Sequence, residues 1–227
     1  MSVRPASVVL VSSGLDSAVL LAHEASQYDV RPVYVRSGLA WEDAEMQMLA
    51  RLLAAPALAA ARELTVVDVP MQDVYPADHW AITGVPPVHD TPDADVYLVG
   101  RNLTLLAKAG IVAMRSSARR IVLGPLSGNP FPDATPAFFT AMAEALSRGL
   151  AHALTIAAPF AALKKAQVIE LGARLGIPFE LTLSCMNPAP GGHCGRCSKC
   201  RERRDAFTEA GVIDPTSYAE SSPRPAP

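Results

Sequence analysis

The four cysteines of the chain all lie in the stretch SCMNPAPGGHCGRCSKC, in the order C-x8-C-x2-C-x2-C. They are Cys185, Cys194, Cys197 and Cys200. Four thiolates with short x2 spacings suit a tetrahedral zinc ion, and four protein ligands close such a site, which makes it structural rather than catalytic. An iron–sulfur cluster also takes four cysteines, and two disulfides are a further alternative. We predict a structural zinc site here and keep both alternatives open.

Ionisable residues of two other kinds surround these cysteines. His193 directly precedes Cys194, and neighbouring residues reach a single metal ion with difficulty, so we expect His193 to be a solvated loop histidine. The basic residues of the segment are Arg196, Lys199, Arg201, Arg203 and Arg204. They suit either a solvated helix face or an anion-binding surface, and the sequence leaves both interpretations open.

A second candidate site lies near the start of the chain, in VVLVSSGLDSAVLLA at residues 8–22. A strand pattern changes there to a helix pattern, and the start of a helix offers unpaired N–H groups and a partial positive charge to an anion. Gly14 allows close approach, and the nearby serine hydroxyls can donate to phosphate oxygens. Asp16 would repel a phosphate unless a cation such as Mg²⁺ lies between them. The stretch therefore indicates a metal–phosphate site.

The same residue types also build an ordinary turn with a helix N-cap. The stretch matches neither the Walker loop nor the dinucleotide fingerprint. Taken alone, it leaves the cap and the phosphate site as alternatives.

Strand and helix patterns alternate along most of the chain, and this order predicts βαβ units on a parallel sheet. The expected strands are 7–12, 31–37, 63–69, 120–124 and 154–158, and the expected helices are 15–27, 41–55, 103–116, 137–149, 163–175 and 198–210. Residues 70–97 and 127–136 are proline-rich, and we expect both to be irregular loops. The fold class predicted is α/β, a doubly wound and mostly parallel sheet.

The composition of the 227 residues is ordinary, with 50% hydrophobic and 19% charged residues and a formal net charge of −2. This balance argues against nucleic acid as a partner. Apolar runs stay short of the roughly 18 residues that a membrane helix needs, and the first residues lack the apolar core of a signal peptide. We expect a cytoplasmic protein without a membrane segment.

The serine-rich turn resembles a known motif. Residues 12–17, Ser-Ser-Gly-Leu-Asp-Ser, are similar to the S-G-G-x-D-S pyrophosphate loop of the N-type ATP pyrophosphatases. Together with SC…HCGRCSKCRERRDAF near the other end, the loop resembles the 7-cyano-7-deazaguanine synthases. Between them, LVGRN at 98–102 is similar to that family's V-P-x-R-N, SGNPFPDATPAFF at 127–139 to its S-G-Y-P-D-C-R-P-x-F, and KKAQVIELG at 164–172 to its K-x-E-I-V-x-L-G. The resemblance covers residues 8–211.

This resemblance implies an ATP-dependent ligase of queuosine biosynthesis. Such an enzyme adenylates 7-carboxy-7-deazaguanine, converts it with ammonia to the amide and then the nitrile, and releases AMP and pyrophosphate. It also implies a Rossmann-like fold of the adenine nucleotide alpha hydrolase type, a small C-terminal zinc-binding subdomain with four cysteine ligands, ATP with Mg²⁺, and a homodimer. The expected division is a nucleotide-binding domain at 1–180, a zinc segment with its helix at 181–211 and a disordered tail at 212–227.

The same resemblance assigns roles to individual residues. Asp16, Lys165 and Arg101 would be catalytic, with Asp16 on Mg²⁺ and the two basic side chains at the α-phosphate. The residues that would bind the nucleotide are Ser12, Ser13, Gly14, Leu15, Asp16, Ser17, Ser37 and Gly38. The residues that would bind the substrate are Asn102, Ser127, Gly128 and Asp133. Taken alone, Lys165 also suits a surface helix lysine, and Arg101 an ion pair at a helix start.

The chain departs from the family pattern at several positions. Ser13 stands where the family has glycine, Ser37-Gly38 stands for tyrosine-glycine, and Pro132-Asp133-Ala134-Thr135 stands for P-D-C-R, after the extra residues 129–131. A paralogue acting on another carboxylate therefore stays open. Two further alternatives are an RNA-thiolating enzyme of the same fold and a non-catalytic zinc module.

Overall fold

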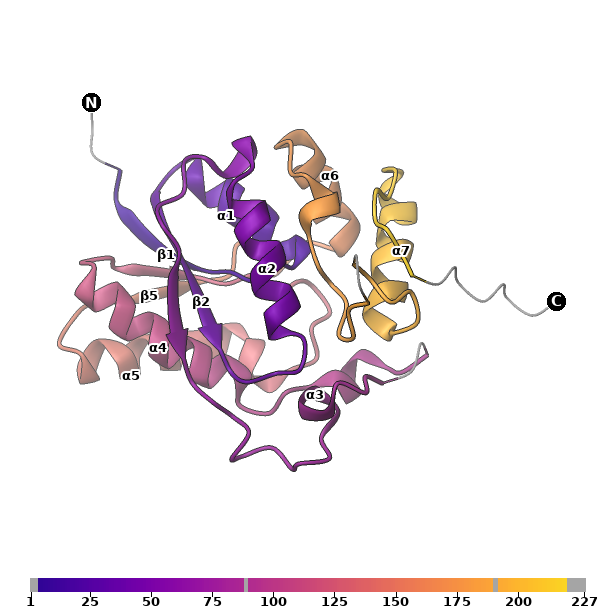
Figure 1. The fold of residues 1–227 in the computed structure, drawn as a ribbon. Coiled ribbons are helices and arrows are strands. Elements are labelled where there is room, and N and C mark those ends of the chain that lie inside the picture. Colours follow the sequence, from indigo (N-terminus) through magenta and orange to yellow (C-terminus); the bar gives the residue numbers. More distant parts are fainter. Residues whose placement is uncertain (1–3, 88–89, 190–191, 220–227) are drawn as a thin grey trace.

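Five strands form one parallel sheet in the order β3-β2-β1-β4-β5 (Figure 1). The computed structural model describes residues 4–87, 90–189 and 192–219. The strands are β1 (Ala6–Leu10), β2 (Asp29–Arg36), β3 (Thr65–Asp68), β4 (Arg120–Val122) and β5 (Thr155–Ala157). β1 lies at the centre, where Val9 is in register with Pro32 of β2 and Val122 of β4. The doubly wound parallel sheet predicted from the sequence is confirmed.

Helices cover both faces of this sheet. The helices of the described residues are α1 (Leu15–Ala25), α2 (Glu42–Leu53), α3 (Trp80–Thr83), α4 (Arg101–Arg115), α5 (Pro136–Gly149), α6 (Lys165–Arg174) and α7 (Ser198–Ala210), with short 3-10 turns at Pro56–Leu58, Asp93–Val96, Pro132–Ala134 and Phe179–Leu181. Buried side chains of α1, α2, α6 and α7 share one core cluster, and those of α4 and α5 share another. Figure 1 shows α7 beside α6, with α4 and α5 across the sheet.

Alternation along the strands creates these two cores. Val9 points into the core under α1, whereas Val8 and Leu10 point into the core under α4. Val8 and Val9 are fully buried, as is Ile121 of β4. A parallel sheet buried on both faces requires such continuous apolar strands, which is why the sequence pattern identified them.

A third core cluster joins two segments that are far apart in the sequence. It contains the four cysteines together with Leu39, Trp41, Met71 and Leu98. Trp41 also stacks on Trp80 of α3, with ring centroids 5.6 Å apart. Residues 70–97 are predicted above to be irregular, but they contain α3 and a 3-10 turn, because their aromatic residues pack against the cysteine segment.

Residues 212–227 are predicted above to be a disordered tail, and this is wrong for residues 212–219. Arg203 is only 1% exposed, and its guanidinium donates to Thr216 Oγ1 (2.6 Å) and lies 3.8 Å from Asp214 Oδ1. The Tyr218 hydroxyl donates to Asp214 (2.7 Å). A buried guanidinium needs acceptors, and this stretch supplies them. Residues 220–227 lie outside the described residues.

None of the helices in the described ranges combines the length and the apolar character that crossing a bilayer would require.

The close packing of α6 on α1 depends on Gly172. A Cβ at this position would lie 2.6 Å from Val19 Cγ2 and 2.7 Å from Phe179 Cζ, and both neighbours are buried. We expect Gly172→Ala to lower the free energy of unfolding by about 1–3 kcal/mol, as overpacking of a core does. Urea denaturation measures the change.

Gly149 provides the matched control, because it is also helical and a Cβ there would meet nothing within 4 Å. Gly149→Ala should leave stability unchanged or raise it by up to about 1 kcal/mol. Equal effects at the two glycines would contradict the packing argument.

Candidate active site

The order of the strands reverses at β1 and β4, and ligands of open α/β sheets bind beyond the carboxyl ends of the strands at such a point. A cavity of about 340 Å³ lies there, and we call it the central cavity. Gly14 lines it together with the polar and aromatic residues Ser12, Asp16, Ser17, Tyr34, Tyr97, Arg101, Asn102, Asn129, Phe131 and Asp133. The fold therefore brings together side chains from β2, the β1–α1 turn and the start of α4.

The β1–α1 turn is held by its own serines. The Ser17 hydroxyl donates to the carbonyl of Ser12 (2.9 Å) and accepts from the Ser12 N–H (3.1 Å). The Gly14 N–H donates to Ser12 Oγ (2.9 Å), and a Cβ on Gly14 would crowd this hydroxyl at the same distance. The first N–H groups of α1 have no partner within the helix, so the turn presents them to the cavity end of the sheet.

Two of the predicted loop residues do not line the cavity. Ser13 is fully buried, its carbonyl accepts from the Leu183 N–H (2.8 Å), and its hydroxyl lacks a hydrogen-bond partner in the described structure. Leu15 is buried in the core under α1. Ser13 is not one of the described non-glycine residues that have a positive φ. A residue with a side chain therefore fits at this position without backbone strain.

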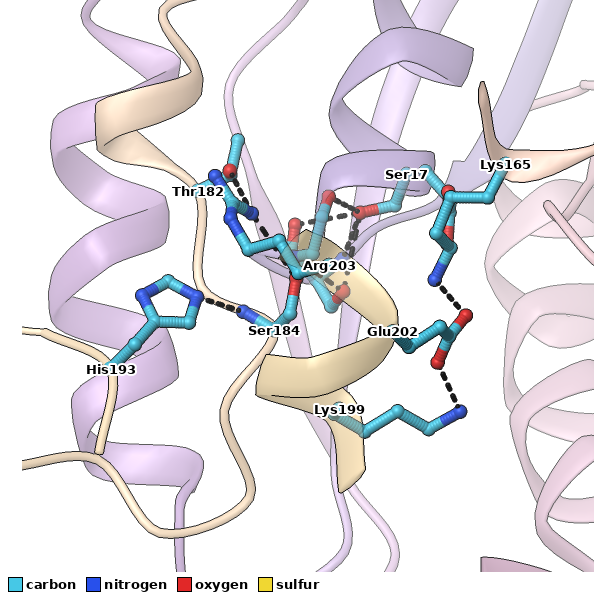
Figure 2. Close-up of polar contacts among 11 residues, drawn as sticks. Ser17, Lys165, Thr182, Ser184, His193, Lys199, Glu202 and Arg203 are labelled. Atoms are coloured by element: carbon cyan, nitrogen blue, oxygen red, sulfur yellow. Dashed lines mark hydrogen bonds and ion pairs between the residues drawn. The ribbon is translucent and has the colours of Figure 1, made fainter. Parts of the chain in front are cut away.

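Asp16 stands where the central cavity meets a second one of about 170 Å³, which we call the lysine cavity. Ser127, Gly128, Lys165, Lys199 and Glu202 line the lysine cavity. Lys165 Nζ lies 3.3 Å from Asp16 Oδ2 and forms an ion pair with Glu202, whose other oxygen lies 2.7 Å from Lys199 Nζ (Figure 2). Positive and negative groups thus alternate from the turn to α7.

The alternating charges set the protonation states of Lys165 and Glu202. Burial raises the pKa of Glu202, but Lys165 and Lys199 outweigh it and lower that pKa to about 2. Burial lowers the pKa of Lys165, but Asp16 and Glu202 raise it well above the usual value. Both groups are therefore charged at neutral pH. Glu202 was not predicted, since nothing local distinguishes it within CRERRDAF.

Asp16 also has the character of a cation ligand. Its Oδ1 is buried and has no hydrogen-bond partner in the described residues, whereas Oδ2 faces Lys165. A buried carboxylate oxygen without a partner is costly unless a ligand satisfies it. The residue therefore fits Mg²⁺ bound together with phosphate oxygens.

Arg101 and two predicted substrate residues meet in the central cavity. The Asn102 N–H donates to Asp133 Oδ2 (3.0 Å), and the Asn102 amide donates to the Asp133 carbonyl (3.0 Å). Arg101 Nη1 is buried without a hydrogen-bond partner in the described structure. Nearby, Tyr34 donates to Glu45 (2.6 Å), and burial raises the pKa of Glu45 although Tyr34 and Arg101 lower it. Arg101 thus offers a positive charge to an anion in this cavity.

Ser37 and Gly38 lie outside the residues that line either cavity. Their N–H groups donate to the two oxygens of Glu42, at 2.6 Å and 2.8 Å. Gly38 has φ of +79°, and a Cβ there would overlap the amide of Gln72. Their predicted contact with the nucleotide stays a prediction. The sequence did not predict that Glu42 holds this turn, because its contacts with Ser37 and Gly38 depend on how the chain folds after β2.

The four cysteines form a compact buried cluster. Their sulfur atoms all lie within 4.8 Å of one another, with Sγ–Sγ distances of 3.8 Å for Cys185–Cys197, 3.9 Å for Cys194–Cys200 and 3.5 Å for Cys197–Cys200. Tetrahedral zinc with Zn–S bonds of about 2.3 Å places its sulfurs about 3.8 Å apart. The N–H groups of Asn187, Cys194 and Arg196 donate to these sulfurs at 3.3–3.4 Å. The cluster therefore fits a closed four-thiolate zinc site.

His193 and Arg203 correct two expectations about this segment. His193 is 3% exposed, and its Nε2 accepts from the Ser184 N–H (3.0 Å), so it is a buried structural histidine rather than a solvated one (Figure 2). Burial lowers its pKa to about 3. Arg203 belongs to neither a solvated face nor an anion surface, because its guanidinium donates to Thr182 (2.9 Å) and the Phe179 carbonyl (2.9 Å).

The serine-rich turn, the charged cavities and the cysteine cluster define an α/β protein with a candidate anion site at its switch point and a separate four-cysteine cluster. A family model described as "Queuosine biosynthesis protein QueC" matches residues 6–211. The 7-cyano-7-deazaguanine synthase of Xanthomonas campestris pv. campestris (strain B100) is 35% identical over 224 residues, which cover 95% of this chain and 98% of that protein. That of Methanopyrus kandleri is 33% identical and covers 94% and 98%.

A further relative, the 7-cyano-7-deazaguanine synthase of Anaeromyxobacter dehalogenans, is 40% identical over 131 residues, 55% of this chain and 56% of that protein. The chain belongs to the QueC, or 7-cyano-7-deazaguanine synthase, family. This is a family of ATP-dependent ligases, so the predicted family and enzyme class are confirmed.

Proposed function

We propose that this protein makes 7-cyano-7-deazaguanine from 7-carboxy-7-deazaguanine, ammonia and ATP. The observation that carries the proposal is the buried, unpartnered Oδ1 of Asp16 at the β1–α1 turn, between the two cavities, in a chain of this family. A carboxylate is a poor electrophile, and the site supplies what its activation by ATP requires: N–H donors, a cation ligand and basic side chains.

The reaction takes two adenylations. A carboxylate oxygen attacks the α-phosphorus of ATP and pyrophosphate leaves, after which ammonia attacks the acyl carbon, AMP leaves and a proton is released. The amide oxygen then attacks a second ATP, pyrophosphate leaves again, and loss of AMP together with both protons of the amide nitrogen gives the nitrile. Each step depends mainly on orientation and on stabilisation of charge, which positioned groups provide.

Different residues of the turn bind different parts of ATP and its Mg²⁺. The N–H groups at the start of α1 and the turn built by Ser12, Gly14 and Ser17 bind the pyrophosphate portion, and Asp16 holds the Mg²⁺. The Mg²⁺ supplies neutralisation of phosphate charge when bound. Lys165 and Arg101 stabilise the charge that develops at the α-phosphate. The four cysteines hold a structural zinc ion. Ser13 and Leu15 support the turn from its buried side, and Ser37 and Gly38 stay assigned to the nucleotide as the family resemblance implies.

The central cavity suits a planar heterocycle that carries a carboxylate. Tyr97 and Phe131 stack there with ring centroids 4.8 Å apart, and both line the cavity. Aromatic faces bind flat rings, and the paired Asn102 and Asp133 offer hydrogen-bonding groups to the ring edge. Ser127 and Gly128 line the lysine cavity instead, so we assign them to the reacting end of the substrate.

Three expectations stay proposals: a cytoplasmic location, a homodimer, and a division of the chain at residues 180 and 211. The cysteine segment shares its core with residues 39–98, so we regard it as a packed part of the enzyme rather than an independent module.

A pyrophosphate-release assay tests the proposed function. With Mg²⁺–ATP and ammonia, 7-carboxy-7-deazaguanine should give two molecules of pyrophosphate per molecule of nitrile, and the amide should give one. Release with another planar acid but none with this substrate would assign the protein to a paralogous reaction, in line with the altered residues at 132–135. If a protein that retains its metal released no pyrophosphate with 7-carboxy-7-deazaguanine or with another planar acid, the proposal would be overturned.

A further inference from the structure

We propose that Glu202 is a positioning residue that directs Lys165 at the ATP loop, and that it thereby makes the four-cysteine site a support for catalysis. The inference rests on the proposed function, in which Lys165 acts at the α-phosphate. It adds a residue of α7, outside the turn and outside the predicted catalytic set.

Lys165 needs a second partner if Asp16 binds a cation. Its Nζ lies 3.3 Å from Asp16 Oδ2, and this carboxylate is the one whose other oxygen is unpartnered. Glu202 of α7 forms an ion pair with the same ammonium group. A lysine ends in a compact charge on a flexible stem, so a single partner leaves it mobile. Glu202 keeps Lys165 in place while Asp16 takes the cation.

The location of Glu202 depends on the cysteine cluster. Cys197 caps the start of α7, Cys200 lies in its first turn, and Glu202 follows two residues later. Lys199 from the same turn binds the other Glu202 oxygen (2.7 Å) and fixes the carboxylate (Figure 2). A metal that orders the cysteines therefore also orders the carboxylate that faces Lys165.

A second ion pair between the start of α6 and α7 serves for comparison, because it is exposed to solvent. Lys164 and Glu209 also join the start of α6 to α7, but their charged atoms lie 3.8 Å apart and their side chains are 72% and 59% exposed. The side chains of Lys165 and Glu202 are 20% and 27% exposed and line the lysine cavity. Exposed pairs contribute little, so Glu209 is the matched control.

The decisive experiment measures kcat and KM for pyrophosphate release with ATP and 7-carboxy-7-deazaguanine. We expect Glu202→Gln to lower kcat about 100-fold, the effect of a catalytic group displaced by about 1 Å, with little change in KM. Glu202→Asp should recover part of the loss because it keeps the charge, and Glu209→Gln should match the wild type. Zinc content and thermal unfolding are measured on each variant.

A double-variant cycle separates positioning from an independent role. If Glu202 acts through Lys165, then Glu202→Gln should change kcat less than about twofold in a Lys165→Ala background. The inference would be overturned if the two substitutions lowered kcat by factors that multiply in the double variant. It would also be overturned if Glu202→Gln kept the wild-type kcat or lost its zinc. Failure of the wild-type protein to release pyrophosphate would instead overturn the proposed function, so the two failures are distinguishable.

Discussion

Asp16→Asn is expected to lower pyrophosphate formation about 100- to 1,000-fold while leaving the fold intact. Asparagine keeps the size of the side chain but removes the charge that would hold Mg²⁺ against the phosphates, and loss of one preorganised electrostatic group costs about 100- to 1,000-fold in comparable sites. The measurement is kcat for pyrophosphate release at saturating ATP, together with the Mg²⁺ concentration at half-maximal rate.

Stability should respond differently from activity. Asp16 Oδ1 is buried without a partner, so its loss removes a desolvated charge, and Lys165 keeps Glu202 as its ion-pair partner. We expect the free energy of unfolding to change by less than about 1 kcal/mol. A variant that unfolds would mean that Asp16 serves the fold rather than the reaction.

Asp68→Asn is the control for this prediction. Asp68 also lies at the carboxyl end of a strand, but its side chain is 72% exposed and it lines neither cavity. Pyrophosphate release by this variant should equal that of the wild type. An equal loss in both variants would point to general electrostatics of the sheet edge instead of a metal ligand.

Cys200→Ser is expected to release the zinc ion and to destabilise the protein by about 4 kcal/mol or more, the range that loss of a structural metal reaches. Cys200 is fully buried in the first turn of α7, and the same helix places Phe207 in the core under α1. Loss of the metal should therefore loosen α7 against α6 as well as the cysteine segment. Metal analysis and thermal unfolding check the first effect, and hydrogen exchange over residues 181–218 checks the second.

The wild-type protein should contain one zinc per chain and show no visible absorption. Met186→Leu is the matched control, because Met186 is buried beside Cys185 and the substitution conserves volume without removing a ligand. This variant should keep its zinc and lose less than about 1.5 kcal/mol. Visible absorption by the purified protein would indicate an iron–sulfur cluster, and a metal-free protein of unchanged stability would contradict the structural role.

Some features follow from short stretches of sequence, because their causes are local. The x2 spacings bring Cys194, Cys197 and Cys200 together within a few residues, so the sulfur cluster is predictable before the fold is known. The change from strand to helix pattern at Gly14 predicts an anion site, and apolar strands identify the sheet. The helix of residues 103–116 begins two residues earlier, at Arg101, because local periodicity defines ends poorly.

Only the tertiary structure decides which distant charges meet. Lys165 has the local sequence of a surface lysine, Arg203 that of a solvated helix and His193 that of an exposed loop, yet none of the three is exposed. Their burial depends on partners outside their own turn or loop: Asp16 for Lys165, Thr182 for Arg203 and Ser184 for His193. The residues next to such a side chain in the sequence are the same whether or not the fold brings a partner to it, so the local sequence does not reveal its burial. The sequence alone therefore determined the four-cysteine cluster, the serine-rich motif after β1 and the sheet, and packing decided that Glu202 of α7 lies beside Lys165.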